Sequence, residues 1–406
     1  MRHSSQPITL DPTQMRLGAG ARRWAVVFAI IGVAGLAVSY FLGPMAGDEA
    51  RKTFFHSYLV NFMYFLSLGL GSLFFVLVSH LVRAGWNATV RRIAEVIAWT
   101  LIPMVVPALV LLWGMNDLYE WSIPAVVEHD AILQHKASFL NPTFFTIRFA
   151  IYFIVWGGLS WWYLGRSVRQ DSVGGVAISS GLERMAPLAM IAYALTVTLA
   201  AFDWMMSLSA HWFSTIYGVY YFAGSALAAF SLCAILTHRL KQSGKLGPAV
   251  NPVHFHDLGK LMFAFVVFWS YIAFSQYMLI WYANMPEETV FFELRQNTTW
   301  VFLSVMLLVG HFALPFLGLI SRIPKLRPAL LSLLGVWVLV IHWFDLFYLV
   351  IPASRPDGPA FNLMDVTCFV GLGGIFLALF IWRLAGVSLV AVKDPRLHES
   401  MELGHA

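Results

Sequence analysis

The stretch "AFDWMMSLSAHWFSTIYGVYYFAG" (residues 201–224) joins two apolar, aromatic-rich runs and carries Asp203 and His211 within them. Ionisable side chains in such a run belong either to a buried soluble core with satisfied polar groups or to membrane-embedded helices. Composition decides between the two. Of the 406 residues, 59% are hydrophobic and only 12% are charged, whereas soluble domains carry roughly 25% charged residues. The sequence therefore predicts an all-α polytopic integral membrane protein.

A helix needs about 20 mostly apolar residues to cross the hydrocarbon core, and this length predicts ten spans. With strict alternation, nineteen of the 26 Lys and Arg residues fall on one side of the membrane and five on the other. Because cytoplasmic loops are enriched in Lys and Arg, both termini are expected in the cytoplasm, and no cleaved signal peptide is expected. The predicted spans are residues 24–43, 53–82, 93–115, 144–164, 185–207, 213–237, 258–284, 299–320, 329–351 and 362–385.

Short motifs recur at corresponding places in spans 2–5 and 6–9. The pattern W-x-x-N-x-x-x-E ends spans 3 and 7, Phe-Asp recurs in spans 5 and 9, His56 aligns with His211, and "NPTFF" and "NTTWV" precede spans 4 and 8. Four matches in register predict two parallel-repeat four-helix bundles flanked by spans 1 and 10. The predicted divisions are a cytoplasmic tail 1–23, the first flanking span 24–43, bundles 53–207 and 208–351, the last flanking span 362–385 and a cytoplasmic tail 386–406.

The sequence predicts neither a metal site nor a nucleic-acid site. Cys233 and Cys368 lie in apolar runs without a C-x-x-C motif, so neither a zinc site nor a cysteine-held iron–sulfur cluster is predicted. The net charge of +5 is explained by orientation in the lipid bilayer and not by nucleic acid. The longest external segment carries four possible metal ligands, but we interpret it as a surface loop or short interfacial helix that docks external partners. These ligands are Glu128, His129, Asp130 and His135.

Polar groups inside the spans are the candidate functional residues, because a charged residue at a helix centre costs on the order of 2.5–3.5 kcal/mol. Asp203 and Asp345 are predicted at matching depth in the two bundles and are the favoured candidates for proton relay or a quinone site. The candidate residues are Asp203, His211, Asp257, Lys260, Tyr271, Ser275, Glu288, His311, His342 and Asp345.

Three other interpretations stay open. Interhelical hydrogen bonds, worth about 0.6 kcal/mol each, would explain single Ser, Thr and Tyr residues. His311 and His342, on consecutive antiparallel spans, form one pair that could ligate a haem. A transporter would place its substrate at the repeat interface beside broken helices, for which Pro103, Pro107 and Pro315 are the candidate breaks.

Two runs carry a family resemblance: "FDWMMSLSAHWFSTIYGVYYFAGS" (residues 202–225) and "HFHDLGKLMFAFVVFWSYIAFSQYMLIWYANMPEET" (residues 254–289). They closely resemble the smaller of two NrfD-like, polysulfide-reductase-type membrane subunits of bacterial alternative complex III, a quinol:cytochrome c oxidoreductase. The resemblance implies an accessory subunit in the bacterial inner membrane, without a redox cofactor of its own, that provides a proton path, a quinone or quinol contact, or both. It also implies partners: the larger NrfD-like subunit, an iron–sulfur protein and multihaem c-type cytochromes, which carry the clusters and haems.

These observations lead to a hypothesis of two half-paths for protons. The inner half-path would begin at His256, Asp257 and Lys260 and continue through Tyr271 and Ser275. The outer half-path would end through Asp203, His211, Asp345 and Glu288. The alternatives are a purely structural membrane anchor and an independent transporter.

Overall fold

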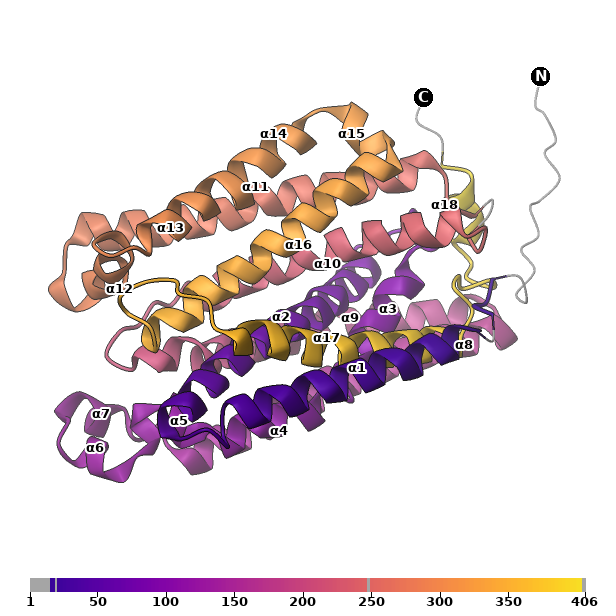
Figure 1. Cartoon of the computed structure of the whole chain (residues 1–406). Helices are drawn as coiled ribbons and strands as arrows, with labels where there is room; N and C mark the ends of the chain where they lie inside the picture. The colour runs from indigo at the N-terminus through magenta and orange to yellow at the C-terminus, as the bar shows by residue number, and fades with distance from the viewer. Residues whose placement is uncertain (1–14, 19, 247–248, 404–406) are drawn as a thin grey trace, which may run out of the picture.

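The computed structural model of the chain describes residues 15–18, 20–246 and 249–403. Every regular element within these ranges is helical, which confirms the all-α prediction. Nine helices of the described part are long and apolar enough to cross a membrane, and most run roughly along one direction (Figure 1). The chain is therefore a multi-pass membrane protein. Most of the predicted tail 1–23, namely residues 1–14 and 19, lies outside the described residues.

Eight of the nine candidate spans are continuous α-helices, and the ninth contains one π turn. The spans are α1 (Gly20–Leu42), α2 (Asp48–Leu81), α8 (Pro142–Val173), α9 (Val176–Trp204), α10 (Tyr217–Gln242), α11 (Pro252–Ala283), α13 (Val301–Leu307) with α14 (Leu314–Ile320), α16 (Pro328–Val350) and α17 (Leu363–Leu384). Shorter helices connect them: α3 (Arg91–Trp99), α4 (Val105–Trp113), α5 (Met115–Leu118), α6 (Pro124–Glu128), α7 (Ala131–Lys136), α12 (Pro286–Gln296) and α15 (Arg322–Leu326). Another short helix, α18 (Leu397–Met401), follows the last span.

The predicted span 93–115 is the one that the structure corrects, since it is not one helix but the broken pair α3 and α4. Between them the backbone tightens, and the N–H groups of Thr100, Leu101 and Ile102 each donate to the carbonyl three residues earlier. Pro103 and Pro107 follow in the sequence. Because proline lacks an N–H and its ring crowds the preceding turn, this segment does not continue as a regular α-helix.

Helices α2 and α10 form the centre of the molecule. Along α2 almost every residue from Phe54 to His80 is buried, and α10 is buried over most of its length. The two helices approach closely because small residues meet at their crossing: a Cβ added to Gly71 would collide with the backbone of Ser225. Packing around this central pair explains why both helices are apolar on all sides.

The flanking helices α1 and α17 pack on each other through glycines. A Cβ added to Gly35 would lie 2.8 Å from the backbone nitrogen of Gly371, and Gly32 faces Gly374 equally closely. Small residues allow membrane helices to make such close contact. The remaining surface of α1 is largely exposed, as expected for a helix at the edge of the bundle. The parallel-repeat arrangement of the central helices remains a prediction.

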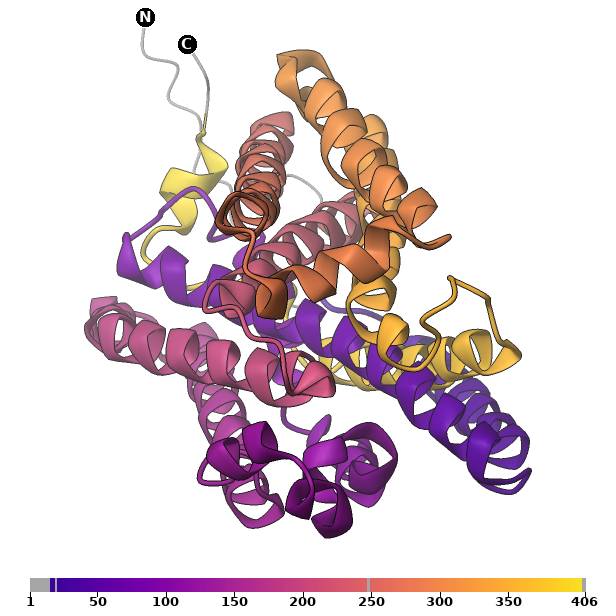
Figure 2. The same ribbon diagram turned by 90° about the vertical axis from the view of Figure 1, so that its left-hand side faces the viewer.

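The two ends of the bundle differ in character. At one end, which we call the C-terminal end, residues 386–403 lie against the bundle, and the N–H of Leu389 donates to the carbonyl of Met15 at 2.8 Å. The other end, which we call the loop end, carries the short helices α5, α6, α7 and α12 (Figures 1 and 2). The described parts of both chain ends thus lie on the same side of the bundle.

Candidate functional site: a buried carboxylate between two histidines

Asp345 of α16 is a buried carboxylate held by neutral hydrogen-bond donors. The hydroxyl of Tyr220 from α10 donates to Oδ1 at 2.5 Å, and the indole Nε1 of Trp269 from α11 donates to Oδ2 at 3.1 Å. Only 1% of Asp345 is exposed. Among the described residues, no Lys or Arg forms an ion pair with Asp345. The charge of the carboxylate is therefore not neutralised, because the Tyr220 hydroxyl and the Trp269 indole are uncharged donors.

Two histidines complete the surroundings of Asp345. The Nδ1 atoms of His311 and His342 lie 3.8 and 3.9 Å from its Oδ2 atom, and the two imidazole rings lie 6.0 Å apart. On its far side, His342 Nε2 contacts Ser67 Oγ of α2 at 3.0 Å. Both ring nitrogens of His311 and the Nδ1 of His342 are buried without a hydrogen-bond partner in the described part of the chain. The cluster therefore retains unused proton donors and acceptors.

A π turn over Leu308–Ala313 positions His311. The N–H of Leu314 donates to the carbonyl of Val309, five residues earlier, and Pro315 has no N–H to offer. The Gly310 carbonyl is thereby left without a helical donor, and the indole of Trp337 donates to it at 2.8 Å. π turns occur frequently at functional sites, and here the turn places an imidazole against the carboxylate of the neighbouring helix.

Gly224 of α10 leaves the space that His342 fills. A Cβ at this position would lie 2.9 Å from Cε1 of His342 and 3.6 Å from Oδ2 of Asp345. The site is thus formed by four helical segments, α10, α11, the α13–α14 span and α16. Of the predicted candidates, the structure brings together Asp345, His311 and His342.

Asp203 has a different environment, although it was predicted as the counterpart of Asp345. Arg148 of α8 binds it through two hydrogen bonds of 2.8 and 2.7 Å, and the Tyr152 hydroxyl donates to the same carboxylate. The guanidinium also lies 3.9 and 4.2 Å from the ring centres of Phe139 and Phe144. Asp203 is completely buried, so its charge is compensated by a bidentate ion pair.

The predicted inner half-path lies along α11. Lys260 Nζ contacts Asp257 Oδ1 at 2.6 Å in the first turns of the helix, and His256 lies beside the same carboxylate. Farther along, Tyr271 is 62% exposed on the outer surface of the bundle, and Ser275 is half-buried. Tyr271 thus faces the outside of the bundle, whereas Trp269, two residues earlier on α11, points to Asp345.

The other two residues of the predicted outer half-path, His211 and Glu288, lie at the loop end. His211 Nε2 contacts Asp130 Oδ2 at 2.6 Å, and Asp130 Oδ1 caps helix α7 by accepting from the N–H groups of Ile132 and Leu133. These N–H groups and His211 hold the pKa of Asp130 below its ordinary value. The backbone carbonyl of Glu288 accepts a hydrogen bond from Trp212. In the described part of the chain, no group of three or more His, Cys, Asp or Glu side chains is arranged so that it could hold a metal ion.

Other side chains contact both His311 and His342. The ring of Trp269 lies 4.0 Å from the ring of His311, and Asp345 lies within 4 Å of both imidazoles. Trp269 and Asp345 therefore lie directly against the imidazoles. A single carboxylate with two imidazoles and a phenol is a set of groups suited to proton exchange.

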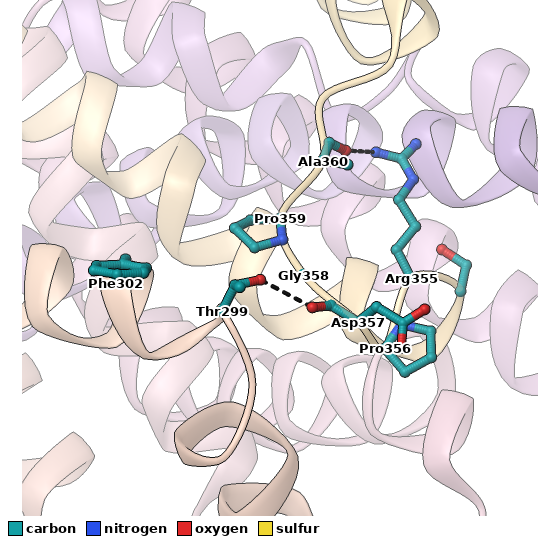
Figure 3. Close-up of a pocket in the computed structure, with 9 residues that line it drawn as sticks. Thr299, Phe302, Arg355, Pro356, Asp357, Gly358, Pro359 and Ala360 are labelled. Atoms are coloured by element: carbon teal, nitrogen blue, oxygen red, sulfur yellow. Dashed lines mark hydrogen bonds between the residues drawn. The ribbon is translucent and has the colours of Figure 1, made fainter.

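Figure 3 shows a separate pocket of about 620 Å³, lined by the loop 354–360 together with Thr299 and Phe302. The guanidinium of Arg355 donates to the carbonyl of Ala360 at 2.6 Å and to the Asp365 carboxylate at 2.9 Å. Thr299 Oγ1 donates to the carbonyl of Asp357 at 2.9 Å. Because the charge of Arg355 is already paired, we assign this region a structural role in holding the loop before α17.

The direct partners of both aspartates are not predicted from the sequence. Arg148, Tyr220 and Trp269 are not among the candidate residues predicted from the sequence. One signal was available: an Arg as the seventh residue of a helix that begins at Pro142 requires a buried counter-charge. Tyr220 and Trp269 lie in aromatic-rich helices, where periodicity alone does not distinguish a hydrogen-bonding ring from a packing one.

No known protein family matches the chain, and no curated protein sequence matches it. The sequence and the structure together establish an all-helical, multi-pass membrane protein with a buried carboxylate–histidine cluster in its second half.

Proposed function

We propose that the chain is a membrane subunit of a quinol-oxidising electron-transfer complex and that it exchanges protons at Asp345. The motif resemblance to the smaller NrfD-like subunit of alternative complex III supports the assignment to a complex. Its expected partners are the larger NrfD-like subunit, an iron–sulfur protein and multihaem c-type cytochromes. In this assignment both termini lie in the cytoplasm, and the two four-helix bundles are parallel repeats.

The contrast between the two buried aspartates carries the proposal. Asp203 is neutralised by Arg148 at 2.7 Å, whereas Asp345 has only neutral donors and two imidazoles around it. Burial of an uncompensated charge costs several kcal/mol. Adding or removing a proton at Asp345 therefore changes the electrostatic energy of the bundle strongly, and the nearby imidazoles can accept or pass on that proton.

The test is substitution of Asp345→Asn in the assembled complex, with electron transfer and proton release measured separately in vesicles. We expect assembly to persist and proton release per electron to fall by at least half, because the amide cannot exchange a proton at this position. Asp345→Glu should restore part of the proton yield. Ser332→Ala, a buried polar substitution on the same helix, is the matched control and should leave both rates unchanged.

An intact Asp345→Asn complex with the wild-type proton yield would contradict the proposal and favour a structural anchor. Uptake of a solute by vesicles containing only this chain would instead favour an independent transporter. The two outcomes are separable because the first measurement uses the assembled complex and the second uses the isolated chain.

A further inference from the structure

The arginines at the C-terminal end of the bundle fall into two groups. Arg91, Arg92 and Arg396 each form an ion pair with a carboxylate. Arg383, near the end of α17, forms no ion pair within the described part of the chain, and its Nε atom is buried there without a hydrogen-bond partner. A charged donor that loses water without gaining a protein partner is costly. Arg383 is therefore suited to bind an anion from outside the chain.

Two tryptophans flank Arg383. Its guanidinium carbon lies 5.4 Å from the ring centre of Trp99, and this ring lies 5.9 Å from the ring of Trp382. Trp382 is 54% exposed, and Arg383 itself is only half-buried, so the remaining guanidinium N–H groups can reach a ligand at the surface. Tryptophan is enriched where the hydrocarbon core meets the lipid headgroups. The ring pair therefore indicates that Arg383 lies at this interface.

Further arginines lie at the same level on α1. The contact of Gly35 with Gly371 fixes the antiparallel register of α1 and α17, and the two helices lie side by side in Figure 1. Twelve residues farther toward the C-terminal end, this register places Arg23 level with Arg383. Arg22 and Arg23 are exposed, and neither forms an ion pair with a described residue. Positive charge without a protein partner thus extends over the ends of both helices.

The depth of these arginines matches that of lipid phosphates. Arg23 directly precedes the predicted span 24–43, and Arg383 is the third residue from the end of the predicted span 362–385. Phosphates of phospholipids lie directly outside the hydrocarbon core that such spans cross. The asymmetry of Lys and Arg assigns this end to the cytoplasm, and the cytoplasmic leaflet carries the anionic lipids that attract basic side chains.

Apolar surface for hydrocarbon chains begins next to the arginines. Trp24, the residue after Arg23, is 62% exposed, and the exposed surface continues along α1 with Ile30 and Val33. A free phosphate or a nucleotide would use the arginines alone and leave this surface uncovered. A molecule that joins a phosphate to hydrocarbon chains uses both, because its charged group stays at the interface while its chains cover the apolar side chains.

We propose that Arg383, supported by Arg22 and Arg23, binds the headgroup of an anionic phospholipid. The guanidinium of Arg383 donates to the phosphate oxygens, since its planar fork of N–H groups matches phosphate geometry. The two tryptophans pack beside the glycerol and the start of the hydrocarbon chains. Arg22 and Arg23 attract the net negative charge that distinguishes an anionic lipid from phosphatidylcholine. The site is independent of proton exchange at Asp345, which lies among other helices.

Native mass spectrometry of the purified full chain, titrated with phosphatidylglycerol or phosphatidylcholine of the same acyl chains, tests the site through the first bound lipid. We expect phosphatidylglycerol to bind at least about fivefold more tightly, because one basic residue near the surface favours an anionic lipid by roughly that factor. Arg383→Gln should remove most of this preference. Arg383→Lys, which keeps the charge but loses the planar fork, should keep part of it. The matched control is Arg184→Gln, an exposed arginine of α9 at the same end, which should bind like the wild type.

Equal affinity of the wild type for both lipids would overturn the proposal, and this comparison needs no variant to fold. An unchanged preference in Arg383→Gln, or an equal loss in Arg184→Gln, would also overturn it. Displacement of the lipid by an equal concentration of glycerol 3-phosphate would indicate a site for water-soluble phosphates instead. Asp345→Asn should bind phosphatidylglycerol like the wild type, so failure of the lipid site and failure of the proton proposal are measured separately.

Discussion

At the scale of single residues, the two buried aspartates show how a neighbouring side chain changes the role of a carboxylate. Asp203 is held by Arg148 and Tyr152, while Asp345 is held by Tyr220 and Trp269. The sequence predicts both aspartates inside the membrane and marks both as candidate functional residues. It could not show that one of them was paired, because Arg148 is 55 positions away along the chain and only packing of α8 on α9 brings them together.

We expect Asp203→Asn to lower the free energy of unfolding by about 3–5 kcal/mol, because it leaves the buried Arg148 without a counter-charge. The double substitution Arg148→Met with Asp203→Leu should recover most of that loss, since apolar side chains of similar size need no compensation. Reversible unfolding in mixed detergent micelles measures both effects. If the single variant is as stable as the wild type, the ion pair does not contribute to stability.

At the scale of helices, proline explains both the largest departure from the predicted spans and the geometry of the site. The predicted span 93–115 is divided near Pro103 and Pro107, and the span 299–320 contains a π turn before Pro315. Hydrophobic length predicts that a segment is buried in the membrane, but it does not report the hydrogen-bond pattern within it. The other nine predicted spans correspond to observed helices, with ends that differ by several residues.

We expect Pro315→Ala to stabilise the helix by up to about 3 kcal/mol, because the alanine N–H can donate to the carbonyl of His311 and restore a regular helix. Removal of the π turn should rotate His311 by about 100° relative to the following turn and separate it from Asp345. Proton release by the complex should then fall although stability rises. Nuclear magnetic resonance of the His311 ring nitrogens would report the change.

The matched control is Pro187→Ala in α9, a proline inside a helix that lies outside the candidate site. This variant should gain stability without loss of proton release. Equal proton release in the Pro315 and Pro187 variants would show that the π turn has no part in the function.

At the scale of the whole molecule, the C-terminal segment connects parts of the chain that are far apart in sequence. Ser400 is fully buried, and its Oγ donates to the carbonyl of Trp86 at 2.6 Å and contacts His254 Nε2 at 3.1 Å. Asp394 pairs with Arg91, and Arg396 pairs with Glu183 at 2.6 Å. Segment 386–403, predicted only as a cytoplasmic tail, therefore holds α3, α9 and α11 together.

We expect Ser400→Ala to cost about 1–3 kcal/mol, because the substitution leaves the buried His254 nitrogen without its hydrogen-bond partner. Backbone amides of residues 386–403 should exchange with deuterium faster, whereas amides of the central helix α2 should be unchanged. Ser243→Ala, at an exposed serine of the same end, should leave exchange unaltered. Uniform protection in both variants would show that the segment does not depend on Ser400.

Composition and hydrophobic length predicted the class of the protein and nine of its spans, because the energy of burying a helix in lipid depends mainly on those properties. Three hydrogen bonds were not predictable. The Ser57 hydroxyl donates to the Asp365 carboxylate, the Asn61 amide donates to the backbone carbonyl of Asp365, and the Trp343 indole donates to the Asn61 side-chain oxygen. These contacts join α2, α16 and α17, and they depend on which helix faces meet, a property that a single sequence does not encode in its periodicity.

The position of the C-terminal segment has a consequence for biosynthesis. Residues 386–403 follow every predicted span along the chain, so the ribosome makes them after all of the spans. Until then, α3, α9 and α11 lack the side chains that join them at this end, and the newly inserted helices can still adjust their mutual packing. The contacts of Asp394, Arg396 and Ser400 can thus form only after every span has been synthesised.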